Sequence, residues 1–253
     1  HHLRNQLTKL EQQGQLLGEV ILVPTANPIG LAQTLLGTSQ GRFDLRTGQN
    51  FNRLFHNLSE EVLERVRSQL SSDPHANQKL IRTAIRDHLK EQTTIDELSA
   101  QRLALMRLAA DADVVLDLHC DCESVLHLYT GTPLWDRVAP LAGLLDARVA
   151  LLETNSGDDP FDEACSRIWW DIAALVGHEF PIPLACLAVT VELRGFTDVS
   201  HDNAERDANA LVDFLRLQGI IAGPISQTMR PACEPTPLAG CIPLTAPSAG
   251  LVV

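Results

Sequence analysis

The chain has 253 residues, of which 45% are hydrophobic and only 4% aromatic, and its formal net charge is −12. This length and apolar content suffice for one α/β domain with an aliphatic core, or for such a domain with a small appendage. The acidic balance and the lack of a Lys/Arg-rich block argue against nucleic acid or a membrane surface as a partner. The six cysteines form no C-x-x-C motif, which favours reduced thiols and a cytoplasmic protein.

Helical and strand-like patterns alternate along the chain. In order, the patterns predict a helix over 3–13, a buried strand over 18–24, a long irregular loop over 33–52, helices over 59–70, 78–90 and 95–110, strands over 113–119 and 125–129, a helix over 134–145, a strand over 147–152, a helix over 162–176, a strand over 185–193 and a helix over 202–217. This alternation predicts an α/β fold with a mostly parallel or mixed sheet.

Beyond Gly219 the texture changes, because prolines punctuate the tail and no helical period survives. We therefore expect a domain over residues 1–222, followed by a linker and the start of a small β-rich module over 223–253. The chain opens inside a helical pattern and stops in strand-like residues, so both ends are expected to be cut.

The first candidate for chemistry ends the strand predicted over 113–119. Asp117 and His119 are two residues apart, so on a strand they point to the same face. A His held by a neighbouring carboxylate is a frequent zinc arrangement, and chemistry in open α/β sheets lies at the carboxyl ends of strands. The alternative is a strand-end His that only hydrogen-bonds. The following residues, 120–123, alternate faces and cannot all reach one ion.

Two further candidates are Asn52–Arg53 and Glu192. Arg offers a planar fork for a carboxylate and Asn adds a donor, although Arg53 could equally be a solvated residue at a helix start. Glu192 ends a strongly apolar strand, where a carboxylate is costly unless it is paired or functional. Burial would raise its pKa toward that of a useful general base. The alternative is a surface pair between Glu192 and Arg194.

Four segments, taken together and in this order, resemble the succinylglutamate desuccinylase/aspartoacylase family, relatives of the zinc carboxypeptidases. They are VPTANPIG (23–30), NFNRLF (50–55), VLDLH (115–119) and AVTVELRG (188–195). The tail segment Thr245 to Gly250 resembles the start of that family's small C-terminal β module. The resemblance implies a zinc-carboxypeptidase-like mixed sheet flanked by helices, with a truncated C-terminal β module.

The resemblance also implies site residues and one Zn²⁺ per chain. His119 matches the third zinc ligand, and Glu192 matches the Glu that acts first as general base and then as acid toward the leaving amine. Asn52 and Arg53 match the pair that holds the substrate carboxylate. A family Arg that polarises the scissile carbonyl corresponds to Arg42, with Arg46 as second choice. On their shared strand face, His127 and Tyr129 either line the pocket or belong to the ordinary core.

One family motif does not stand where it is expected. The first two zinc ligands come from an H-x-x-E motif before the opening helix, and His1 and His2 have no Glu three residues on. The one match in spacing, His88 to Glu91, is interpreted as a chance match on a solvated helix face. We expect the motif to lie upstream; the alternatives are that His1 or His2 is a tag remnant or substitute ligand, or that the protein is a metal-free relative.

These observations predict a zinc-dependent hydrolase that removes an N-acyl group from an amino-acid-like substrate. A metallocarboxypeptidase for short peptides and a non-catalytic ligand-binding relative are the alternatives. The expected partner is a small molecule that bears a carboxylate, and a homo-oligomer is left open. The sequence specifies neither the acyl group nor the amino acid.

Overall fold

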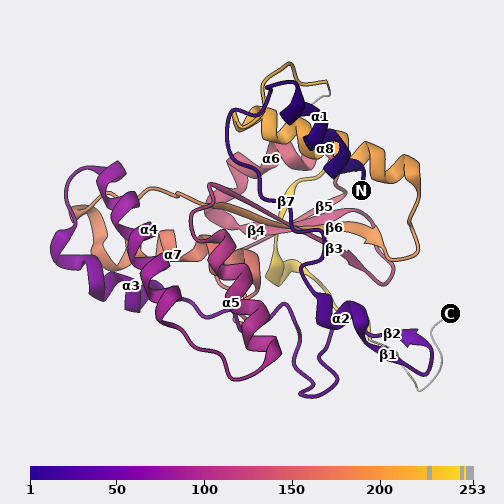
Figure 1. Cartoon of the computed structure of the whole chain (residues 1–253), viewed down its shortest axis with the longest axis horizontal. Coiled ribbons are helices and arrows are strands. Elements are labelled where there is room, and N and C mark those ends of the chain that lie inside the picture. Colours follow the sequence, from indigo (N-terminus) through magenta and orange to yellow (C-terminus); the bar gives the residue numbers. More distant parts are fainter. Residues whose placement is uncertain (227–229, 246–247, 249–253) are drawn as a thin grey trace.

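A five-stranded mixed sheet forms the centre of the computed structural model, which describes residues 1–226, 230–245 and 248 (Figure 1). Its strands are β3 (Val114–Asp121), β4 (His127–Gly131), β5 (Val149–Glu153), β6 (Leu187–Gly195) and β7 (Pro235–Pro237). They lie in the order β3-β6-β4-β5-β7, and β4 runs antiparallel to β6 while the other neighbours are parallel. The predicted α/β class with a mixed sheet is confirmed.

Helices cover both faces of this sheet (Figure 1). The helices of the described residues are α1 (His2–Gln12), α2 (Pro28–Ala32), α3 (Ser59–Val66), α4 (Pro74–Glu91), α5 (Glu97–Ala109), α6 (Trp135–Leu144), α7 (Phe161–Val176) and α8 (His201–Leu217), with 3-10 turns at Arg67–Gln69, Thr132–Leu134, Gly177–Glu179 and Leu238–Gly240. Among the described residues, no helix is both long and apolar enough to cross a membrane.

The alternation of side chains along β6 decides which helices cover which face. Leu187, Val189 and Val191 pack into a core cluster with residues of α6 and α8. Ala188 belongs to a second cluster, built with residues of α3, α4, α5 and α7. Thr190 and Glu192 share the parity of Ala188, so they belong to the face that α7 covers.

Local capping signals account for several helix starts. Asp73 accepts a hydrogen bond from the backbone N–H of His75 at 2.9 Å, and Pro74 occupies the first turn, so α4 begins four residues before the predicted helix over 78–90. Asp96 and Ser99 form a capping box at the start of α5. The predicted helices therefore exist, and their boundaries shift where a cap lies ahead of the apolar period.

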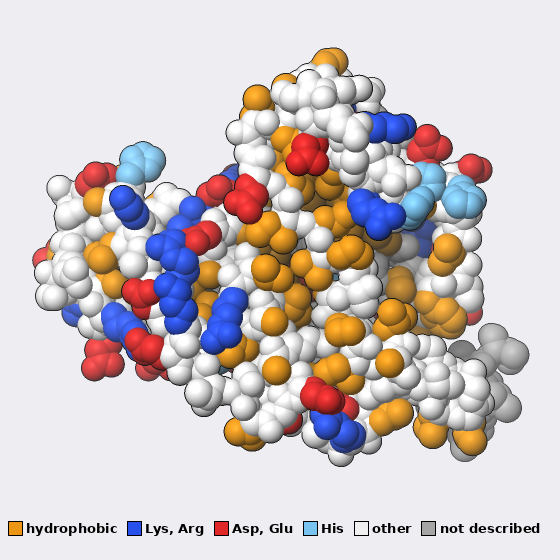
Figure 2. Space-filling model, in the orientation of Figure 1, with side chains coloured by type: hydrophobic (Ala, Val, Ile, Leu, Met, Phe, Trp, Pro, Cys, Tyr) orange, Lys and Arg blue, Asp and Glu red, His pale blue; other side chains and the backbone are white. Residues whose placement is uncertain are grey.

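The strand predicted over 18–24 is wrong. This segment has no regular structure, and Ile21 and Leu22 expose 56% and 36% of their surface. Hydrophobic side chains gather on this face of the molecule in the region between α1 and α2 (Figure 2). Within the described residues the segment pairs with no strand of the sheet, and an apolar run becomes a strand only where its backbone groups find partners.

The predicted loop over 33–52 contains one small hairpin, β1 (Thr34–Leu35) with β2 (Thr38–Ser39), and is otherwise irregular. In the tail, β7 pairs with β5 and so joins the main sheet. The division of the chain at residue 222 stays a prediction. The tail segment that resembles the family's β module falls largely on residues 246, 247, 249 and 250, which lie outside the described residues.

Candidate active site

Polar side chains from three neighbouring strands meet on the face of the sheet that α7 covers. In the parallel pairing of β3 with β6, Asp117 lies beside Thr190 and His119 lies beside Glu192. In the antiparallel pairing of β4 with β6, His127 lies beside Glu192. Because β3 and β6 are parallel, their polar ends fall at the same edge of the sheet, where ligands of open α/β sheets bind.

The imidazole of His119 is held between two carboxylates. Its Nε2 lies 2.8 Å from Asp117 Oδ2, and its Nδ1 lies 3.8 Å from Glu192 Oε1. Burial acts to lower the pKa of His119, but the hydrogen bond and charge of Asp117, together with the charge of Glu192, outweigh it and the pKa is raised. His119 is thus hydrogen-bonded to one carboxylate and faces a second, an arrangement compatible both with a zinc ligand and with a His that only hydrogen-bonds.

Glu192 is a largely buried carboxylate, with 14% of its side chain exposed. Burial raises its pKa against the opposing effect of His119 and His127, and its Oε2 has no hydrogen-bond partner among the described residues. The alternative of a surface pair with Arg194 is wrong. Arg194 has a left-handed backbone (φ 74°), and its guanidinium donates instead to both Asp207 oxygens, at 2.8 and 2.9 Å.

Sequence reasoning missed Asp162, in the first turn of α7. The residue is buried, and burial together with the charge of Asp117 raises its pKa to about 7. The sequence holds no signal for this, because an acidic residue in the first turn of a helix is ordinary and its placement against Asp117 depends on how α7 crosses the sheet.

Asn52 and Arg53 lie beside this cluster. The amide of Asn52 accepts a hydrogen bond from the Phe161 backbone N–H at 3.0 Å and directs its Nδ2 toward His119 Nε2 at 3.5 Å. Arg53 donates from Nη1 to the carbonyl of Asn52 at 2.7 Å, and its Nε lies 3.4 Å from Asp158 Oδ2. The pair thus combines a donor next to His119 with a guanidinium that faces a carboxylate.

The remaining predicted site residues are Arg42, Arg46 and Tyr129, and they differ in the part of the fold that they contact. Arg42 Nη1 is 3.9 Å from Asp121 Oδ1, at the end of β3, whereas Arg46 pairs with Asp44 and with Glu97 at the start of α5. Of the two arginines, Arg42 is the one beside the strand ends. The Tyr129 ring packs against His127 at 5.3 Å, and burial followed by the charge of Glu192 raises the Tyr129 pKa.

The match in spacing at His88 and Glu91 lies on α4 and takes no part in this cluster. Glu91 pairs with Arg65 at 2.6 Å on the surface, as expected for a solvated face. His88, however, is only 8% exposed, so the interpretation as a wholly solvated pair is wrong.

The donors present fit part of a zinc site. His119 with Asp117 has the arrangement of a ligating imidazole and its orienting carboxylate. Glu192 Oε2, which is buried and meets no hydrogen-bond partner within the described ranges, suits an adjacent base. Across residues 1–226, 230–245 and 248, no three His, Cys, Asp or Glu side chains group as a metal site, whereas zinc takes three or four protein ligands. These residues could therefore supply one ligand of a zinc ion and not a complete set.

The chain matches the succinylglutamate desuccinylase/aspartoacylase catalytic domain over residues 2–218. A protein of that family from Shewanella amazonensis is 31% identical, with a TM-score of 0.75, and the match covers 98% of this chain and 68% of that one. A similar structure from Shewanella frigidimarina is 28% identical, with a TM-score of 0.75, covering 99% and 67%.

A more distant structure, from Rhodobacter sphaeroides, is 16% identical with a TM-score of 0.52, covering 94% of this chain and 57% of that one, and shares the fold. No curated protein matches the chain. The match over residues 2–218, which include β3, β6 and α7, agrees with the resemblance of the motifs around His119 and Glu192. The chain belongs to the succinylglutamate desuccinylase/aspartoacylase family of deacylases.

Proposed function

We propose that the chain forms the core of a zinc-dependent hydrolase that removes an N-acyl group from a small amino-acid-like substrate. The observation that carries the proposal is the largely buried Glu192 carboxylate: its Oε1 lies 3.8 Å from His119 Nδ1, and its Oε2 has no hydrogen-bond partner in the part of the chain that the structure describes. A buried carboxylate without a hydrogen-bond partner is costly, and it is retained where chemistry needs it.

Glu192 is proposed as the proton carrier. The raised pKa brings the carboxyl closer to neutrality, where a group can both accept and return a proton. Glu192 would take a proton from the water that adds to the amide carbonyl carbon. It would then deliver this proton to the nitrogen as the C–N bond breaks, so that a carboxylic acid and an amine leave; the acid then passes its remaining proton to the amine, which gives a carboxylate and an ammonium ion.

His119 is proposed as one zinc ligand, with Asp117 orienting its ring. Zinc supplies, when bound, Lewis acidity that activates water at neutral pH and stabilises negative charge. The described residues hold only part of a ligand set, so the remaining ligands would have to come from outside them.

Asn52 and Arg53 are proposed to bind the substrate carboxylate. Asn52 lies beside His119 and Arg53 contacts the Asn52 carbonyl, and a guanidinium with a neighbouring amide offers charged and neutral donors to one anionic group. Arg42, at the end of β3, is proposed to polarise the scissile carbonyl, and Tyr129 to line the pocket next to Glu192.

The test is Glu192→Gln in the natural full-length polypeptide, assayed for amine release from N-acetyl and N-succinyl amino acids. Gln keeps the size of Glu but cannot accept a proton and return it, so turnover should fall by about 10²- to 10⁴-fold. Zinc content should stay at that of the wild type, while His119→Ala should lose zinc. If Glu192→Gln retains full turnover, Glu192 is not the proton carrier. Cleavage of short peptides in place of N-acyl amino acids would assign a carboxypeptidase.

A further inference from the structure

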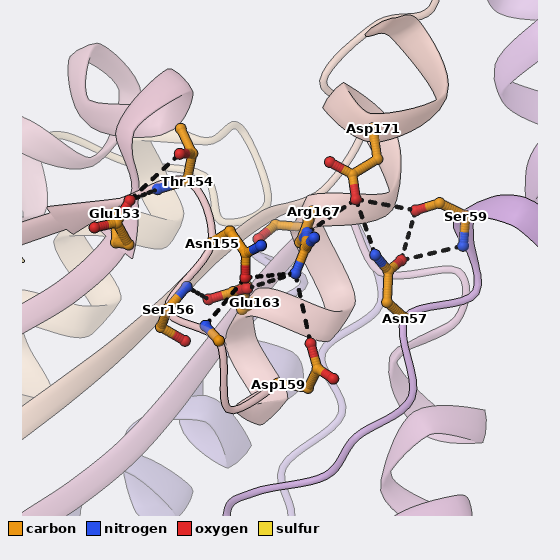
Figure 3. A network of polar contacts seen from close by, with 12 residues as sticks. Asn57, Ser59, Glu153, Thr154, Asn155, Ser156, Asp159, Glu163, Arg167 and Asp171 are labelled. Carbon is orange, nitrogen blue, oxygen red and sulfur yellow. Dashed lines mark hydrogen bonds and ion pairs between the residues drawn. The ribbon is translucent and has the colours of Figure 1, made fainter. Parts of the chain in front are cut away.

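The loop between β5 and α7, residues 154–160, is fixed in place by a charged cluster around Arg167 (Figure 3). The Arg167 guanidinium donates to Asn155 Oδ1 at 2.8 Å and to Glu163 Oε1 at 3.1 Å, and it lies 3.5 Å from Asp159 Oδ1. Glu163 in turn accepts a hydrogen bond from the Ser156 backbone N–H at 2.9 Å. Because several residues of the loop are bound at once, the loop cannot swing away from α7 without breaking the cluster.

The opposite side of the loop is bound to the chain that follows Arg53. The backbone N–H of Leu54 donates to the Asp158 carbonyl at 3.1 Å, and that of Phe55 donates to the Asp159 carbonyl at 2.9 Å. Leu54 and Asp159 both have left-handed backbones, with φ of 61° and 45°. Asp adopts this conformation readily, but Leu keeps it only where its surroundings impose it, so the Leu54 backbone is held by its contact with the loop.

This double attachment places the Asp158 carboxylate on Arg53. Asp158 Oδ2 lies 3.4 Å from Arg53 Nε, and Arg53 is the only ion-pair partner of Asp158 among the described residues. The Asp158 side chain is 73% exposed and that of Arg53 is 35% exposed, so solvent reaches both members of the pair. An anion that binds Arg53 must therefore displace Asp158 from Nε or accept its repulsion.

We propose that Asp158 is a specificity-determining residue, which competes with anionic ligands for Arg53 and so sets the affinity of the Asn52–Arg53 pair for a carboxylate. The inference rests on the substrate-binding part of the proposed function. A carboxylate of the chain itself beside the guanidinium weakens binding of singly charged anions and favours ligands that make further contacts around His119 and Glu192. It would thereby discriminate a substrate from small carboxylates that have no other group to contact the site.

The first measurement is equilibrium binding of acetate, a single carboxylate, to the full-length protein. Binding is followed by the NMR resonance of Arg53 Nε–H, which is assigned by its loss in Arg53→Lys. Asp158→Asn removes one exposed charge while the backbone carbonyl that accepts from Leu54 remains. We expect acetate to bind about two- to fivefold more tightly in this variant, the effect of one exposed charge. Acetamide, which is uncharged, should bind both proteins equally.

Asp146→Asn is the matched control. Asp146 is also exposed (67%) and is ion-paired with Arg148. Asp146 precedes β5, whereas residues 154–160 follow β5, so Asp146 lies toward the opposite end of that strand. Its acetate affinity should equal that of the wild type. Unchanged or weaker acetate binding in Asp158→Asn, or equal tightening in Asp146→Asn, would overturn the inference. If acetate binding behaves as expected but no amide is hydrolysed, the proposed function fails and the competition at Arg53 stands.

Discussion

Burial alters the chemistry of single polar side chains well away from the strand ends. His88, on α4, is 8% exposed, and its Nε2 lies 2.9 Å from the side-chain amide nitrogen of Gln92. Its Nδ1 is buried without a partner in the part of the chain that is described. Burial, with the positive charge of Arg65 adding to it, lowers the pKa of His88. The folded protein therefore favours the neutral ring.

This residue predicts a loss of stability in mild acid. As the pH falls below about 6.5, the ordinary His pKa, His88 binds a proton in the unfolded chain but stays neutral in the folded chain. The unfolded state then binds more protons, so the free energy of unfolding falls with pH until the lower folded pKa is reached. Urea unfolding at neutral and mildly acidic pH should show that His88→Gln reduces this loss. The exposed His75→Gln, on the same helix, should not; equal behaviour of the two variants would contradict the prediction.

At the scale of elements, the connection between β5 and α7 depends on Arg167. Its side chain is only 17% exposed, and it meets Glu163, Asp159 and Asp171. Asp171 also accepts a hydrogen bond from Asn57 at 2.9 Å, which ties the start of α3 to α7 (Figure 3). One guanidinium thus neutralises carboxylates that belong to a helix and to the loop before it.

Removal of that guanidinium should be costly. Arg167→Leu leaves the buried Glu163 without its cation, and we expect the free energy of unfolding to fall by about 2–4 kcal/mol, slightly below the range for fully buried pairs. Urea denaturation followed by circular dichroism measures this change. Arg148→Leu removes an arginine that is 61% exposed and should cost less than about 1 kcal/mol. Similar decreases in the free energy of unfolding for the two variants would show that Arg167 stabilises the fold no more than an exposed arginine does.

At the scale of the whole molecule, the sheet and its two helical layers separate the cysteines into distinct classes. Cys165 and Cys186 lie in the core cluster that α7 forms with the sheet, and burial raises the pKa of Cys186 to about 12. Cys120, Cys122 and Cys241 are exposed, and Cys233 is intermediate. Since the thiolate is the reactive form, burial protects a thiol both by exclusion and by keeping it protonated.

Thiol labelling at about pH 8 should therefore divide the cysteines by position. We expect Cys120, Cys122 and Cys241 to react with an aromatic disulfide within minutes, whereas Cys165 and Cys186 react only as fast as the molecule unfolds. Peptide mass spectrometry identifies the labelled sites, and denaturant should open all six to the reagent. Rapid labelling of Cys186 in the native protein would show that the α7 layer opens independently of global unfolding.

Local patterns were sufficient to predict most of the architecture. A period of two placed Asp117 and His119 on one face, and a polar end on an apolar strand marked Glu192, because these signals depend only on neighbours along the chain. The match to the family confirms the resemblance drawn from four short segments. Helix existence was equally readable, although the start of α4 depended on a cap at Asp73 that lies ahead of its apolar period.

Contacts between distant segments could not be read in this way. The apolar run over 18–24 looks like a strand, but a strand needs a backbone partner, and none of the described strands pairs with it. In the sequence, Asp158 resembles an ordinary loop residue and Asp162 an ordinary acidic residue at a helix start. Asp162 acquires its raised pKa because α7 brings it against Asp117, and Asp158 meets Arg53 because the Arg167 cluster and the Leu54 hydrogen bond hold the loop there. Such charge placements arise from packing between elements, which no local period encodes.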